Sequence, residues 1–390
     1  MNNNQKSIQK YCVGCGLCKS VNKETVLEKD DGGFFHPIKF DYSMLHLICP
    51  AAGNHSYKLD RNNIWGRSHG VYRGYSTDLS TRHLCSSGGI LTELSSYLLE
   101  NGIVDVVIHT KADSDRPTET VTCYSKTRDE LLEGAGSRYS ISHPLNWLSK
   151  LECGKKYAFI GKPCDVVALR NYIEVRPKLK SNFLYLFSFF CMGIPSVAAQ
   201  KKLLERLGCN NGCEKLTYRG NGWPGYTVAV DNNNESHSID YDSSWGKILG
   251  RDLMPACRFC IDGIGEMADI SCGDAWYIKD GKPDFSEHEG RNVVFARTQK
   301  GLELLRKVQQ DGNIFLEPYE DFDRELPIIQ KSQFTRRQSM KYRIAAMKLC
   351  LKPHPRYDSC LMNSYSSGYG VKNIIKTFVG TAKRVITHKM

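Results

Sequence analysis

The 390-residue sequence lacks any apolar run long enough to cross a membrane as a helix. Its longest, residues 183–194, has about a dozen residues, whereas a bilayer-spanning helix needs about 20. The first residues, MNNNQKSIQKYC, are polar and lack the apolar segment of a secretory signal. Internal repeats and low-complexity segments are also missing. We therefore expect a cytoplasmic protein, and an apolar content of 41% is typical of folded domains rather than disorder.

Acidic residues are almost missing from the last 60 residues. In 331–390, thirteen Lys or Arg stand against Asp358 alone, which gives a net charge of +12. The remaining 330 residues have 40 basic and 41 acidic side chains, a net charge of −1. The basicity thus belongs to a C-terminal extension, and charge gives no support for nucleic-acid binding by the body of the protein.

The end of this extension predicts an amphipathic helix over residues 371–389. Its apolar residues fall on one arc of a helical wheel: Val371, Ile374, Ile375, Phe378, Val379, Ala382, Val385 and Ile386. Lys372, Lys376, Lys383 and Arg384 lie off that arc. Two interpretations stay open. The helix lies on an anionic membrane surface, as a peripheral contact at the inner membrane face, or it packs on the protein's own body or a partner.

Sixteen cysteines without an export signal favour ligands or redox groups over disulfides. Cys12-x2-Cys15-x2-Cys18 is half of a bacterial ferredoxin signature, whose fourth cysteine would ligate a second cluster. Asn22 occupies that fourth position. Of the second cysteine run that a two-cluster ferredoxin has, only Cys49, which proline follows, is present. We therefore predict that Cys49 completes the cluster of the first three. The alternative is a zinc site with four cysteine ligands, which also uses C-x2-C pairs.

A second metal-type pair, Cys257-x2-Cys260, needs two further thiolates. Cys164 and Cys191 each follow a predicted strand, where open α/β sheets gather their ligands, and each is flanked by Pro or Gly. A rival pair, Cys209 and Cys213, lies in a polar turn. We predict a second cubane held by Cys164, Cys191, Cys257 and Cys260.

Strands alternate with helices along the middle of the chain, which predicts an α/β fold with a mixed or parallel sheet. Strands are expected at 103–108, 156–160, 183–190 and 292–297, and helices at 90–98, 166–172, 196–207 and 300–308. We expect three regions. Residues 1–60 are a small ferredoxin-like iron–sulfur segment, 61–330 are the α/β catalytic region with a sub-boundary near 208, and 331–390 are the basic extension.

Ser86-Ser87-Gly88-Gly89 opens the helix at 90–98. Free backbone N–H groups at such a helix start can hold a phosphate. Plain capping by serine beside glycine is the alternative. The nearby His83 is interpreted as a surface or packed histidine, so the sequence assigns no catalytic residue.

Several segments together resemble the coenzyme F420 hydrogenase/dehydrogenase beta-subunit family, in its bacterial branch. The matching pieces span roughly residues 9–300: the N-terminal cysteine run, SSGGILTELSSYLL (86–99), GSRY (136–139), GKPCDVVALR (161–170), FFCMGIPS (189–196) and CRFC…ADISCGDAW (257–276). The chain is also similar to the plant 7-hydroxymethyl chlorophyll reductase branch, with two clusters and one flavin.

The resemblance implies an iron–sulfur flavoprotein oxidoreductase with two [4Fe–4S] clusters and FAD. It implies flavin contacts by Ser86, Ser87, Gly88, Gly89, Ser137, Arg138, Tyr139, Lys162, Asp274 and Trp276. We expect ferredoxin or a similar donor to feed the clusters, and a small molecule to accept or donate hydride. Bacterial members often accompany glycan-assembly enzymes, which hints at the substrate.

The family often has Thr at the position of Lys162, Gln at that of Asp165 and His at that of Met192. These departures leave open whether a deazaflavin is the substrate. The competing hypothesis from another class is a zinc-stabilised binding protein that contacts a polyanion through its basic extension.

Overall fold

An eight-stranded mixed sheet forms the centre of the computed structural model, which describes residues 3–387. Its strands follow the order β15 (Ile314–Pro318), β3 (Gly70–Ser76), β14 (Asn292–Ala296), β11 (Ile270–Asp274), β7 (Phe183–Phe189), β6 (Tyr157–Gly161), β4 (Val106–Ala112) and β5 (Thr120–Ser125). The pairs β4–β6, β6–β7 and β7–β11 are parallel, and the outer pairs are antiparallel. The predicted α/β class with a mixed sheet is confirmed.

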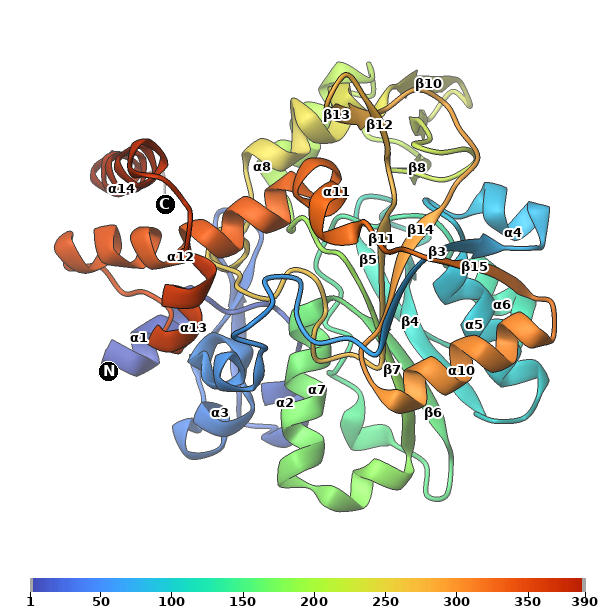
Figure 1. The fold of residues 1–390 in the computed structure, drawn as a ribbon, viewed down its shortest axis with the longest axis horizontal. Helices are drawn as coiled ribbons and strands as arrows, with labels where there is room; N and C mark the ends of the chain where they lie inside the picture. The colour runs from blue at the N-terminus through green and yellow to red at the C-terminus, as the bar shows by residue number, and fades with distance from the viewer. Residues whose placement is uncertain (1–2, 388–390) are drawn as a thin grey trace.

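Both faces of this sheet are buried, because successive side chains of a strand point to opposite sides. On β6, Tyr157 and Phe159 join one buried cluster, whereas Ala158 joins another. The first face is covered by α7 (Pro163–Val175) and the N-terminal segment, and the second by α5 (Ile90–Glu100) and α10 (Gln299–Gln310) (Figure 1). Burial on both faces is the usual state of parallel strands.

The N-terminal segment is built from short elements that pack against α7. They are α1 (Asn3–Lys10), α2 (Leu17–Val21), β1 (Val26–Lys29), β2 (Phe35–Lys39) and α3 (Tyr42–Ile48), followed by two 3₁₀ turns at Pro50–Ala52 and Asn54–Lys58. Ile8, Leu17 and Ile48 are buried in the same cluster as Val166 and Leu169 of α7. The segment therefore shares its core with the sheet.

A smaller antiparallel sheet adjoins the large one. It contains β8 (Lys215–Thr217), β9 (Thr227–Val230) and β10 (Ser236–Ile239), packed with α8 (Val197–Arg206). The hairpin β12 (Tyr277–Lys279) and β13 (Lys282–Asp284) lies beside it (Figure 1). Short helices α4 (Leu79–Leu84), α6 (Arg128–Leu132) and α9 (Pro255–Arg258) connect the strands.

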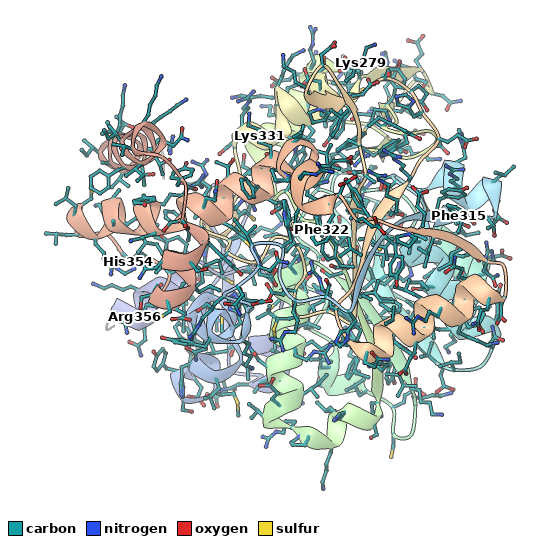
Figure 2. The ribbon with its side chains drawn as sticks, in the orientation of Figure 1. Lys279, Phe315, Phe322, Lys331, His354 and Arg356 are labelled. Atoms are coloured by element: carbon teal, nitrogen blue, oxygen red, sulfur yellow. The ribbon has the colours of Figure 1, made fainter. Side chains whose placement is uncertain are left out.

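The C-terminal extension is helical and folds back over the N-terminal half. Helix α11 (Phe322–Ile329) precedes it, and the extension itself contains α12 (Lys331–Leu349), α13 (Ser359–Tyr365) and α14 (Val371–Ile386). Figure 2 labels Phe322 and Lys331 near the body of the molecule, and His354 and Arg356 beside α13, close to the N-terminal elements. Tyr11 Oη donates to the Pro353 carbonyl at 2.8 Å, so the two ends of the chain are in contact.

The predicted amphipathic helix is observed as α14, which lies across α12 (Figure 1). The apolar residues of α14 differ in their exposure. Val385 is buried, while Val371, Ile375, Val379 and Ile386 are 57–72% exposed. The last two residues of the predicted helix, 388 and 389, lie outside the described residues. Among the helices that residues 3–387 form, none has the length and apolar character to cross a membrane.

Candidate functional site

The four N-terminal cysteines, which we call the outer set, line one small cavity. Cys12 and Cys15 lie in the loop between α1 and α2, Cys18 lies in α2, and Cys49 directly follows α3. Burial raises the pKa of Cys12 to about 12. Burial also raises the pKa of Cys15, and repulsion from Cys49 adds to it. Thiols whose pKa is raised by burial carry negative charge only beside a cation, and a metal centre supplies such a cation.

Glycines give the outer loop its tight winding. Gly14 and Gly16 have positive φ angles of 67° and 81°, a conformation that favours glycine. A side chain at Gly16 would also approach Asn146 and His143 to 3.1 Å. The Leu145 amide donates to the Cys15 carbonyl at 2.9 Å. The cysteine loop is thereby fixed against residues 143–146, a contact that no pattern in the sequence predicts.

Four further cysteines, the inner set, line a second cavity: Cys164, Cys191, Cys257 and Cys260. Cys164 lies in the first turn of α7, Cys191 follows β7, and Cys257 and Cys260 lie in and just after α9. Burial raises the pKa of Cys257 to about 12 and that of Cys260 to about 11. The structure thus brings together the four residues that the sequence predicts as ligands. Their ligation of a cluster stays a prediction.

The rival pair lies elsewhere. Cys209 and Cys213 belong to the buried cluster of α8 and the small sheet, and neither lines the inner cavity. Cys272 is buried in β11, as expected of a packed strand cysteine, although it also borders a third cavity, beside Asp274.

Neither set gathers three thiols at the spacing of a single-ion site. In the described part of the chain, no three cysteine Sγ atoms lie within 4.8 Å of one another. Four thiolates bound to a single zinc ion, at about 2.3 Å each, would lie roughly 3.8 Å apart. Thiolates on the separate irons of a cubane are spread more widely. The spacing therefore favours clusters over single ions in both sets.

A larger cavity of about 250 Å³ opens at the carboxyl ends of β6, β7 and β11. This is the edge where open α/β sheets bind ligands. Eight of the ten predicted flavin contacts line it: Ser86, Ser87, Gly89, Ser137, Arg138, Tyr139, Lys162 and Asp274. Contact of these residues with a cofactor stays a prediction.

The other two predicted contacts, Gly88 and Trp276, do not line the cavity. A Cβ on Gly88 would come within 2.8 Å of Asn292, so this glycine is packed against β14. The Trp276 ring stacks on Trp223 at 4.5 Å in a buried cluster behind Asp274. Both residues support the wall of the cavity from outside.

Arg219 and Asn292 line the cavity and were missed by sequence reasoning. Arg219 donates two hydrogen bonds of 3.0 Å to the Asp274 carboxylate, and Trp223 Nε1 donates a third at 2.8 Å. Asn292 Nδ2 donates to Ser87 Oγ at 3.0 Å. The glycine-rich turn that follows Arg219 in the sequence could have indicated Arg219, whereas no sequence feature indicated Asn292.

Arg138 connects two parts of the cavity wall through hydrogen bonds. Its guanidinium donates to the carbonyl groups of Glu119 and Leu216, at 2.9 and 2.8 Å. Those carbonyls belong to a loop before β5 and to β8. Arg138 therefore joins the large and small sheets at the rim of the cavity.

Lys162 lies between the large and inner cavities and borders both. Its ammonium forms a buried ion pair of 2.7 Å with Asp165. Burial alone would lower the pKa of Lys162, but the Asp165 carboxylate outweighs it and the pKa is raised. The opposite charges of Lys162 and Asp165 thus compensate each other within the wall.

The three cavities share walls. Val13 borders both the outer and the inner cavity. Lys162, Cys191, Gly193 and Ile194 border both the inner and the large cavity. The outer cysteine set, the inner cysteine set and the large cavity are therefore arranged in that order.

Family models match two stretches of the chain. Two family models describe the beta subunit of coenzyme F420 hydrogenase/dehydrogenase, one for its N-terminal part and one for its C terminus. Residues 71–149 match the first, and residues 154–322 match the second. The inner cysteines lie in the second match, and the outer cysteines and α12–α14 lie outside both.

Individual relatives bear related names. The coenzyme F420 hydrogenase subunit beta of Methanosarcina barkeri is 28% identical over 66% of this chain and 84% of its own length. That of Methanothermobacter thermautotrophicus is 27% identical over 72% and 95%. The coenzyme F420-dependent sulfite reductase of Methanocaldococcus jannaschii is 25% identical over 85% of this chain, which spans 51% of that protein.

A solved structure shares the fold. A chain of the F420-reducing [NiFe] hydrogenase complex from Methanosarcina barkeri superposes with a TM-score of 0.55 and 22% identity. The match covers 75% of this chain and 97% of that one.

Proposed function

This chain belongs to the coenzyme F420 hydrogenase/dehydrogenase beta-subunit family, and from that premise we propose that it is an iron–sulfur flavoprotein oxidoreductase. It couples one-electron transfer through two [4Fe–4S] clusters to two-electron hydride chemistry at FAD. The observation that carries the proposal is the row of three cavities with shared walls, two of them lined by four cysteines each.

The donor sets fit these groups. The outer set holds one cluster through Cys12, Cys15, Cys18 and Cys49, and the inner set holds the other through Cys164, Cys191, Cys257 and Cys260. Backbone amides support the thiolates: Gly14 N–H donates to Cys12 Sγ at 3.4 Å, and Ile194 N–H donates to Cys257 Sγ at 3.3 Å. Such hydrogen bonds stabilise the negative charge of ligating sulfur.

The large cavity fits a flavin with a diphosphate. Ser86, Ser87 and Gly89 line it at the start of α5, where free N–H groups and the helix dipole favour phosphate. A bound flavin supplies the exchange between hydride and single electrons, chemistry that belongs to the cofactor. The ion pair of Lys162 with Asp165 lies at the wall toward the inner set, and Arg219 holds the Asp274 carboxylate in place.

External partners follow from the order of the cavities. The outer set lies in the N-terminal segment, so a ferredoxin or a similar protein donor delivers electrons there. The large cavity then serves a small organic molecule that accepts hydride. The solved relative belongs to an F420-reducing hydrogenase complex, which favours a deazaflavin as the acceptor, and the resemblance favours a step linked to glycan assembly.

Metal and flavin analysis of the anaerobically purified full chain tests the proposal. It predicts about eight iron atoms per chain, matching sulfide, and one flavin. Cys49→Ser should remove or convert one cluster and leave flavin bound, while the matched control Cys213→Ser should change neither. Stoichiometric zinc without iron or flavin would instead support a zinc-stabilised binding protein.

The exposed half of the α14 arc gives a second, separate proposal: peripheral binding to an anionic membrane surface. Val371, Ile375, Val379 and Ile386 are exposed on α14. Lys372, Lys376, Lys383 and Arg384 are exposed around them, and α14 contains no acidic residue. An exposed apolar stripe among cations fits anionic lipid through both burial and charge.

Co-sedimentation of the full chain with vesicles tests this contact. Binding is expected with vesicles rich in anionic lipid, weaker binding with neutral ones, and loss of binding in the double variant Ile375→Ser/Val379→Ser. Leu79→Ser, which replaces an equally exposed apolar residue on α4, is the matched control. Equal sedimentation of both variants would contradict the proposal, as would self-association through α14 without lipid binding.

A further inference from the structure

Helix α12 brings a cation to the inner cysteine set. Arg336 borders the inner cavity together with Cys164, Cys191, Cys257 and Cys260, and its side chain is only 8% exposed. The family models end at residue 322, so this arginine comes from the extension rather than from the matched region.

Neighbouring contacts fix Arg336 in this position. Its Nη2 donates to the Met192 carbonyl at 3.0 Å. Gln333, one turn earlier, donates to the Cys191 carbonyl at 2.7 Å. Arg337, the next residue, is buried in ion pairs with Asp262 and Glu266, which anchor the helix. The helix therefore clamps the loop that carries Cys191.

The charge of Arg336 is not neutralised by a carboxylate. Within residues 3–387, no Asp or Glu oxygen lies within 4.0 Å of its guanidinium, in contrast to Arg337. The Arg336 side chain instead borders the cavity that Cys191, Cys257 and Cys260 line. A buried charge is little screened by solvent or salt.

We infer that Arg336 raises the reduction potential of the inner cluster. The inference rests on the proposed function. A cluster that gains one electron becomes more negative, and a fixed cation nearby stabilises the reduced form more than the oxidised form. Arg336 thereby makes the inner cluster the better electron acceptor, so the extension tunes a centre that the matched region encloses.

Redox titration of the full chain, followed by electron paramagnetic resonance, tests this role. Two neutral variants, Arg336→Gln and Arg336→Met, should each lower the midpoint potential of one cluster and leave the other unchanged. Arg336→Lys should stay close to the wild-type value. Lys341→Gln, which removes an exposed charge from the same helix, is the matched control and should shift neither potential.

High salt separates a buried charge from a general surface effect. The shift in Arg336→Gln should persist at high salt, because a buried charge is weakly screened. The inference is overturned if the midpoint potentials of the two neutral Arg336 variants equal those of the wild type, or if Lys341→Gln shifts them by the same amount. It is also overturned if the potential in Arg336→Lys is as low as in Arg336→Gln. Loss of the inner cluster from both neutral variants would assign Arg336 to cluster assembly and also overturn it. Absence of iron from the wild type would instead refute the proposed function itself.

Discussion

Asp165→Asn removes the charge that balances Lys162 between the inner and large cavities. Both side chains are buried, at 0% and 7% exposure, and their charged atoms lie 2.7 Å apart. At that distance the gross attraction is about 6 kcal/mol for an effective dielectric constant of 20. Loss of one partner from a buried pair typically costs about 3–5 kcal/mol, because the other charge remains without compensation.

Thermal unfolding of the full chain measures the effect. With an unfolding entropy of roughly 2.1 cal/mol/K per residue, a loss of about 3–5 kcal/mol lowers Tm by about 4–6 °C. Asp242→Asn breaks the exposed pair with Lys247 at 3.1 Å and is the matched control. Its cost should stay below about 1 kcal/mol.

A double variant that replaces both members of the ion pair provides a second test. Lys162→Thr/Asp165→Gln replaces the pair with the residues usual in the family, and it should be more stable than Asp165→Asn, because no buried charge is left unpaired. The reasoning is refuted if Asp165→Asn lowers Tm no more than Asp242→Asn does, or if the double variant is no more stable than Asp165→Asn.

Three further outcomes are expected. Cys257→Ser should lose the inner cluster while the outer cluster's iron remains, as measured by iron content and spectrum; retention of all the iron would contradict the assignment. Arg219→Gln should weaken flavin retention during dialysis, because it releases the Asp274 carboxylate that Arg219 holds through two hydrogen bonds of 3.0 Å; unchanged flavin content would place both residues outside the binding site. Burial lowers the pKa of His109 to about 4, so the neutral side chain stabilises the fold at a pH above its ordinary pKa of about 6.5. This contribution is lost as the pH falls from about 6.5 toward 4. His109→Gln should therefore show a shallower decline in Tm over this range than the wild type, and an identical decline would exclude the contribution.

Local patterns in the sequence predicted the central strands well. β6, β7 and β14 lie within one residue of their predicted bounds, because each contains a short run of mostly apolar residues. β4 begins three residues later than predicted. Ile103 closes the end of α5 instead, by donating its amide to the Leu98 carbonyl. The antiparallel strands β3, β5 and β15 are half-exposed and mixed in composition, so their periodicity carried no signal.

The cysteine sets could be predicted because spacing and position after strands carry information about ligands. Trp276 was expected at the large cavity only through the family resemblance, and Gly88 also through its place at a helix start. Packing against Trp223 and Asn292 places both behind the wall. Arg336 could not be found from the sequence. Its position depends on how α12 folds back over residues far away in the chain, which no local pattern encodes.

The central claim is that two iron–sulfur clusters lie next to each other, separated by a wall to which Val13 contributes. Electron paramagnetic resonance of the fully reduced, anaerobically purified chain tests this most directly. The account predicts two cluster spins per chain with a broadened, interacting spectrum, which becomes that of one isolated cluster in Cys49→Ser. A spectrum without cluster signals, or two signals that do not interact, would contradict it.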